Sequence, residues 1–159
     1  NHVDNLDGPV VFRALPRSHR NRLAIAQAAD FMHDHRTVAF GARLCFAAFN
    51  FARQAPFLPS LEYTAKLVDQ GWNIAMFPEG KIARTSRLRP FKSGIGLLAV
   101  ELGVPIVPVK TNGLYGTLHA SWPKKRSNVT ITIGAPVVFD HKTSYDQATR
   151  KLEAIMRAL

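Results

Sequence analysis

The sequence predicts an α/β fold, a single domain with a mixed, mostly parallel sheet flanked by helices. Short apolar segments with strand character alternate along the chain with segments of helical spacing, and no repeat or low-complexity tract interrupts them. At 159 residues the chain has the usual length of one domain and can bury a core. Its hydrophobic content of 47% and charged content of 20% are ordinary for a folded protein.

The first half of the chain is expected to contain two helices around a strand. Residues 9–15 read as a short helix, which ends in a basic loop at 16–22. A strand is expected at 23–27. A second helix is expected over 61–70. Ser60 is its expected cap, and the glycine that directly follows residue 70 is expected to end it.

The most apolar segment of the chain, residues 38–53, has three open interpretations. Phe40, Leu44, Ala48 and Phe51 fit one helical stripe, which favours a helix buried in the core. The same segment could form a helix at a membrane interface or the wall of an acyl-chain tunnel. Its pattern alone does not separate these alternatives.

The second half is expected to place polar residues at the end of a strand. A short strand at 72–77 runs directly into a polar turn, and ligands bind at the carboxyl ends of strands in open α/β sheets. A helix is expected from Ser93 to about Gly103. Strands are expected at 104–109 and 129–133, and a closing amphipathic helix at 144–159.

Charge and cysteine content narrow the possible partners. The 21 Lys and Arg residues against 11 Asp and Glu give a formal charge of +10, which predicts affinity for nucleic acid, acidic lipid headgroups or phosphorylated substrates. Nucleic acid is disfavoured because the basic residues are scattered and no binding module is recognised. Cys45 is the only cysteine, so no internal disulfide can form, and no cysteine-histidine spacing predicts a metal site.

The opening of the chain carries a candidate catalytic pair. His2 and Asp7 lie five positions apart, and on an unbroken helix such positions point roughly 140° away from each other. They can meet only if His2 precedes a helix and Asp7 lies in its first turn. A neutral imidazole oriented by a carboxylate can activate a substrate hydroxyl, which is worth roughly a hundred- to ten-thousand-fold in rate.

The same spacing recurs at His141 and Asp146, so the pair is a weak signal by itself. A surface histidine beside a helix-capping acid is the ordinary interpretation of either pair. A second candidate site is the loop after the polar turn, where four basic residues precede a glycine-bearing helix start: Arg84, Arg87, Arg89 and Lys92. Such residues form natural phosphate sites, although any one of them is more often simply solvated.

Three ordered sequence blocks resemble the glycerolipid acyltransferase family, which includes the 1-acylglycerol-3-phosphate acyltransferases. Asn1-His2 with Asp7 resembles the first block of the family. Phe77-Pro78-Glu79-Gly80 with Arg84 resembles the third block, and residues 104–108 resemble the fourth. The resemblance runs essentially from end to end, and Phe91-Lys92-Ser93-Gly94 is also typical of the family.

The resemblance implies transfer of a fatty acyl group from a thioester of coenzyme A or acyl carrier protein to the hydroxyl of a lysophospholipid such as 1-acylglycerol-3-phosphate. His2 would be the general base, oriented by Asp7. The substrate-binding residues that the resemblance implies are Arg53, Phe77, Pro78, Glu79, Gly80, Lys81, Arg84, Lys92 and Pro105. Among these, Pro105 would shape the pocket, and no metal or bound cofactor would be needed.

Two segments depart from the family pattern. Lys81-Ile82-Ala83 stands where many members have Thr-Arg-Ser, so a bidentate phosphate donor is missing at Ile82. Lys81 or Arg84 could replace that donor, or the acceptor could lack a phosphomonoester. The second block is represented only loosely, and Arg53 is its candidate phosphate ligand.

The resemblance also implies a membrane-associated protein at the cytoplasmic face, bound to a surface with anionic lipids. The chain starts without methionine, and the segment before Arg53 is closer to the subgroup fused to acyl-activating ligases. An upstream membrane anchor or ligase domain is therefore expected. The alternatives are a non-catalytic lipid-binding domain of the same fold, a thioester hydrolase and, less favoured, a nucleic-acid-binding domain.

Overall fold

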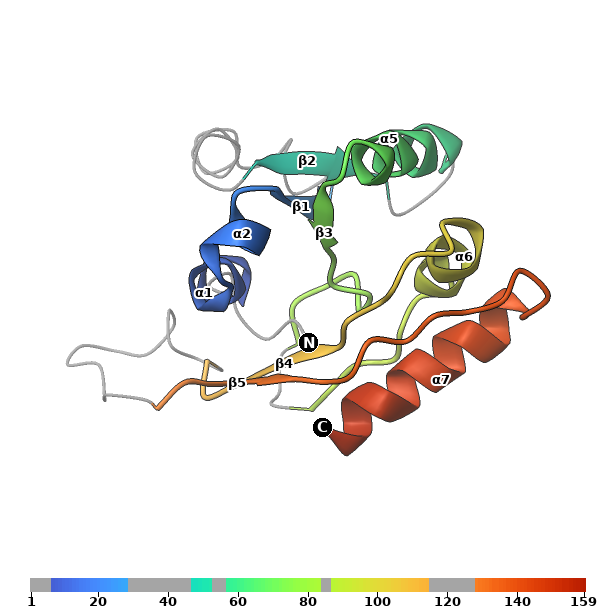
Figure 1. The fold of residues 1–159 in the computed structure, drawn as a ribbon. Coiled ribbons are helices and arrows are strands. Elements are labelled where there is room, and N and C mark those ends of the chain that lie inside the picture. The colour runs from blue at the N-terminus through green and yellow to red at the C-terminus, as the bar shows by residue number, and fades with distance from the viewer. Residues whose placement is uncertain (1–6, 29–46, 53–56, 84–86, 115–127) are drawn as a thin grey trace. The chain divides into compact units, whose positions relative to one another are not determined.

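The chain forms two compact units in the computed structural model (Figure 1). One unit comprises Asn1–Asp7 and Pro78–Leu159, and the other comprises Gly8–Phe77. The structure describes residues 7–28, 47–52, 57–83, 87–114 and 128–159. Among these residues, no helix has both the length and the apolar character needed to cross a membrane.

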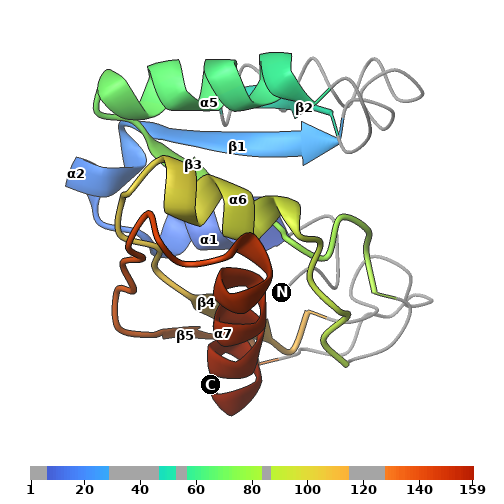
Figure 2. The ribbon, with the colours of Figure 1, turned by 90° about the vertical axis from the view of Figure 1, so that its right-hand side faces the viewer.

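The unit Gly8–Phe77 is built on a three-stranded parallel sheet with the order β2-β1-β3. The central strand β1 (Leu23–Ala28) lies between β2 (Ala48–Phe51) and β3 (Asn73–Ala75). Its first three residues are at most 4% exposed, as expected for a parallel strand covered on both faces. Figure 2 shows α5 on one side of these strands and α1 on the other. The predicted α/β fold is confirmed.

The short helices of this unit agree in part with the prediction. Helix α1 (Asp7–Ala14) confirms the helix expected at 9–15. The loop predicted at 16–22 is wrong in its centre, because Arg17–Arg20 form helix α2. Pro16 precedes α2 with a φ of −55°, and its carbonyl accepts hydrogen bonds from the first turn of the helix.

The helical stripe predicted for residues 38–53 is wrong at its carboxyl end, because Ala48–Phe51 form strand β2. Residues 38–46 lie outside the described part of the chain. Phe49 and Phe51 are two positions apart and therefore share one face of the strand. The ring of Phe49 lies 5.4 Å from that of Tyr63, and Phe51 packs edge-on against Phe57 at 5.3 Å. This aromatic packing favours the strand.

Helix α5 (Leu58–Asp69) begins earlier than predicted. Ser60 is not its cap: Phe57 is the N-cap residue, and a proline occupies the first turn, where it is tolerated. The Ser60 hydroxyl instead accepts a hydrogen bond of 2.8 Å from the backbone N–H of Ala52, just beyond β2. The predicted stop is confirmed, because Gly71 follows with a φ of +78°.

The other unit packs two helices beside an antiparallel strand pair. Helix α6 (Gly94–Glu101) packs against α7 (Tyr145–Ala158), as Figure 2 shows. Strand β4 (Val109–Asn112) pairs with β5 (Thr130–Ile133). The buried core comprises Ala99, Val100, Phe139, Ala148 and Leu152. Both helices and β5 lie close to the predicted segments.

The strand predicted at 104–109 is wrong over most of its length, because β4 starts only at Val109. Pro105 and Pro108 lack the N–H donor that a continuous ladder requires, which leaves Ile106 to form an isolated antiparallel bridge with Val137. The strand expected at 72–77 is likewise shorter than predicted and covers Asn73–Ala75.

Candidate functional site

Asp7 is the first residue of α1 and is completely buried. The hydroxyl of Thr111, in β4, donates a hydrogen bond of 2.9 Å to Oδ1 of Asp7. A carboxylate is favoured in the first turn of a helix by the helix dipole, and burial of its charge requires hydrogen-bond partners. Asp7 thus occupies the first turn that a pairing with His2 requires, although the helix expected at 9–15 begins after it.

His2 lies outside the described residues, so its pairing with Asp7 stays a prediction. The second pair with the same spacing has a different environment. His141 is exposed, and Asp146 is exposed in the first turn of α7. Burial therefore separates two acids that sequence spacing alone treats as equivalent.

The turn after β3 folds a second carboxylate into the protein. Glu79 is 1% exposed, and its Oε2 accepts a hydrogen bond of 2.8 Å from the backbone N–H of Arg89. The carbonyl of Pro78 accepts a second bond of 2.9 Å from the backbone N–H of Lys92. Gly80 has a φ of +69°, which suits glycine. The two hydrogen bonds close residues 78–92 into a loop.

The outer side of this loop is basic. Lys81, Arg87, Arg89 and Lys92 are exposed, and Arg84 lies outside the described residues. Residues 78–92 contain five basic residues and a single acidic one, Glu79. Because this acid is buried, the exposed part of the loop favours anions.

The remaining predicted site residues lie in varied environments. Phe77 and Pro78 are partly buried, Pro105 is exposed, and Arg53 is outside the described part of the chain. At the departure from the family pattern, Ala83 is only 2% exposed. Ile82 beside it is partly buried.

Thr111 is the site residue that sequence reasoning missed. It lies 104 positions from Asp7, so no local spacing joins them. It also falls beyond the strand predicted at 104–109. The family blocks end before this position, so only the folded chain identifies it.

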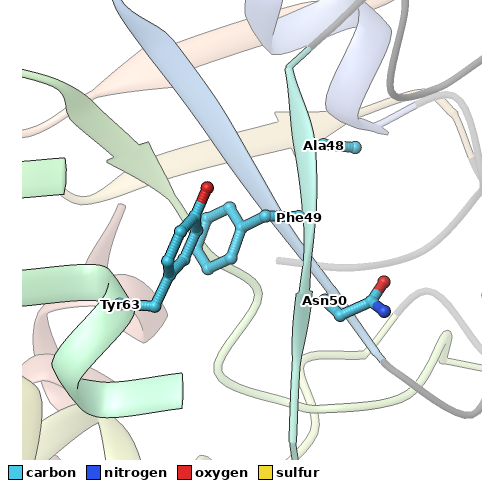
Figure 3. A pocket seen from close by; sticks show the side chains of 4 residues that line it. All are labelled: Ala48, Phe49, Asn50 and Tyr63. Atoms are coloured by element: carbon cyan, nitrogen blue, oxygen red, sulfur yellow. The ribbon is translucent and has the colours of Figure 1, made fainter. Parts of the chain in front are cut away.

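A shallow hollow of about 360 Å³ lies in the unit Gly8–Phe77. Figure 3 shows its lining: Phe49 and Tyr63 face one another, and Ala48 and Asn50 point to the other side of β2. Among the described residues that line it, none is a predicted site residue. Within the described residues, no group of three His, Cys, Asp or Glu side chains could hold a metal ion.

The fold is that of a known acyltransferase structure. It is similar to the crystal structure of the 1-acyl-sn-glycerophosphate (LPA) acyltransferase PlsC from Thermotoga maritima, with a TM-score of 0.70 and 20% identity. The similarity covers 99% of this chain and 61% of that protein. The family model described as Acyltransferase matches residues 1–112. The chain belongs to the glycerolipid acyltransferase family, as its sequence blocks predict.

Curated relatives agree with this assignment. The chain is 40% identical over 53 residues to the 1-acyl-sn-glycerol-3-phosphate acyltransferase BAT2 of Brassica napus. It is 30% identical over 84 residues to the 1-acyl-sn-glycerol-3-phosphate acyltransferase of Cocos nucifera. The matched segments span 15% and 26% of those relatives.

Proposed function

We propose that the protein transfers a fatty acyl group from a thioester to the hydroxyl of a lysophospholipid such as 1-acylglycerol-3-phosphate. The donor is a thioester of coenzyme A or of acyl carrier protein. The observation that carries the proposal is the buried carboxylate of Asp7 in the first turn of α1, five positions after His2. Membership of the family and the names of its relatives support the same reaction.

In the proposed step, the acceptor hydroxyl attacks the thioester carbonyl while Nε2 or Nδ1 of His2 takes its proton. Asp7 stabilises the imidazolium that forms. The tetrahedral intermediate then collapses, the C–S bond breaks, and the imidazolium returns the proton to the leaving thiolate. The products are an ester and a free thiol, so no metal or redox cofactor enters the balance.

The proposed headgroup site is the loop of residues 78–92. Exposed Lys81, Arg87 and Lys92 supply the charge that a phosphate group would require. Glu79 is held by the backbone of Arg89, which supports a role in shaping this loop. Ile82 supplies no guanidinium to this site. The headgroup preference is therefore to be measured by comparing acyl transfer to several lysolipid acceptors.

We also propose that the protein works at a membrane surface with anionic lipids, at the cytoplasmic face. The formal charge of +10 supports this partner. Upstream anchoring or ligase domains remain part of the same proposal.

The decisive experiment compares His2→Ala with His141→Ala. Each variant is incubated with acyl-coenzyme A or acyl carrier protein and a pool of lysolipids, and products are identified by mass spectrometry. We expect His2→Ala to lose roughly a hundred- to ten-thousand-fold in rate, whereas His141→Ala keeps wild-type activity. Near-wild-type turnover by His2→Ala would refute the mechanism. Release of free fatty acid without acylated lipid would identify a hydrolase instead.

A further inference from the structure

We infer that Thr111 is a positioning residue that sets the orientation of the Asp7 carboxylate toward His2. The inference rests on the proposed function, because it assigns Thr111 a role in the proposed catalytic pair. It concerns a residue outside the three sequence blocks that resemble those of the family, which end at residue 108.

The contact joins two side chains that are almost inaccessible to solvent. Asp7 is 0% exposed and Thr111 is 2% exposed, and Thr111 Oγ1 lies 2.9 Å from Asp7 Oδ1. A hydroxyl that donates to a carboxylate forms a charge-assisted bond, stronger than a bond between neutral groups. In this setting water competes little with it.

The bond restricts the carboxylate because it holds one of two oxygens. Rotation about Cβ–Cγ of Asp7 would carry Oδ1 away from the Thr111 hydroxyl. With Oδ1 held, the direction of Oδ2 is also set. In a base–acid pair, the direction of the carboxylate oxygen determines how the imidazole is oriented.

Thr111 is itself held firmly by its surroundings. It is the third of four β4 residues paired with β5, and it lies opposite Ile131. Threonine is β-branched, which restricts its side-chain rotation. Two residues later Gly113 has a φ of +86°, and a Cβ at this position would lie 2.1 Å from the carbonyl oxygen of Asn128. The hydroxyl is therefore presented from a well-defined piece of backbone.

The test compares Thr111→Val, which removes the hydroxyl at nearly constant shape, with Thr111→Ser, which keeps it. We expect Thr111→Val to lower kcat by about 10- to 100-fold, by analogy with the loss of groups that orient the ligands of metal sites. KM for the acceptor should stay nearly constant. Thr111→Ser should recover most of kcat. Thr132→Val, on the partner strand and opposite Lys110, is the matched control and should keep wild-type kinetics.

The pH profile of kcat/KM provides a readout that a purely structural role would not move. A well-placed carboxylate raises the pKa of a neighbouring imidazole, since it favours the charged form. Poorer placement in Thr111→Val lowers that pKa, and the neutral base then persists to lower pH. We therefore expect the acid limb of the profile to move to lower pH in Thr111→Val and to return in Thr111→Ser.

The outcomes separate this inference from the proposed function. If His2→Ala is inactive but folded Thr111→Val keeps wild-type kcat and the wild-type acid limb, the positioning role is refuted and the mechanism stands. If His2→Ala is active, the mechanism itself fails. If Thr111→Val does not fold, Thr111→Ala replaces it, because alanine also lacks a donor. Wild-type kinetics in folded Thr111→Ala would then refute the role, and reduced kcat with constant KM would support it.

Discussion

Asp7 and Glu79 carry two buried carboxylates in the same unit of the protein. Asp7 is held by the hydroxyl of Thr111, 104 positions away in the chain, and Glu79 is held by the backbone N–H of Arg89 within its own loop. A buried charge is costly unless such partners satisfy it. These acids therefore occupy defined orientations, in contrast to the solvated acids of the surface.

At Asp7, replacement by asparagine tests the carboxylate with little change in volume. The amide cannot stabilise an imidazolium as an ionised acid does, so we expect Asp7→Asn to lower kcat by roughly a hundred- to ten-thousand-fold. Initial rates of acyl transfer measure the loss. Asp146→Asn, at the exposed first-turn acid of α7, should keep normal rates. Equal effects of the two substitutions would contradict the assignment of Asp7.

At the scale of elements, the helix pair α6–α7 depends on a close backbone approach at Gly96. A Cβ built there would lie 2.0 Å from the carbonyl oxygen of Tyr145 and 2.3 Å from Thr149 Oγ1. The first of these atoms is backbone, and the second is a hydroxyl that donates a hydrogen bond of 2.8 Å to the carbonyl of Tyr145. The two helices would have to separate to accept a methyl group.

We therefore expect Gly96→Ala to lower the free energy of unfolding by about 1–3 kcal/mol, the usual cost of overpacking. Gly94→Ala, in the first turn of the same helix, is the matched control and should change stability by at most about 1 kcal/mol, without a loss of packing. Urea denaturation followed by circular dichroism measures both. A Gly96→Ala protein as stable as wild type would show that the helices do not pack this closely.

A second link at this scale joins α7 to the segment before α6. Glu153 Oε2 accepts a hydrogen bond of 2.9 Å from the backbone N–H of Phe91, and Oε1 pairs with Arg157 at 2.6 Å. The Phe91 hydrogen bond, followed by the bond to Arg157, lowers the pKa of Glu153 below its ordinary value of 4.5. The ionised form is therefore the one that folding favours.

This pKa shift predicts a pH-dependent contribution to stability. The contribution is fully present above pH 4.5 and is lost as the pH falls through the lowered pKa of the folded protein. Glu153→Gln should unfold at a lower urea concentration than wild type at neutral pH. The difference should shrink at acidic pH. A difference that stays constant across this range would contradict the role of the charge.

At the scale of the whole molecule, the formal charge of +10 predicts salt-sensitive binding to anionic membranes. Screening shortens the reach of charges from about 10 Å at 0.1 M salt to about 3 Å at 1 M. We expect co-sedimentation with vesicles containing phosphatidylglycerol to fall steeply over this range. Vesicles of phosphatidylcholine alone are the control. Binding that is equal for both lipids and independent of salt would contradict an electrostatic attachment.

The local sequence was sufficient to predict an element where that element's own residues determine its structure. Helix α7 was predictable because Ser144 and Gln147 form a capping box ahead of an amphipathic pattern. Strand β2 was not, because alanine and phenylalanine suit both a helical stripe and a strand. As a strand it pairs with β1 and packs against Tyr63 and Phe57, and all of these partners lie outside residues 38–53.

The sequence by itself determined the α/β class and the family, because each depends on residues that lie close together in the chain or in ordered blocks. Only the tertiary structure decided which of two equally spaced acids is buried, and that Thr111 holds it. Burial and contacts across 104 positions arise from packing, which local spacing does not encode.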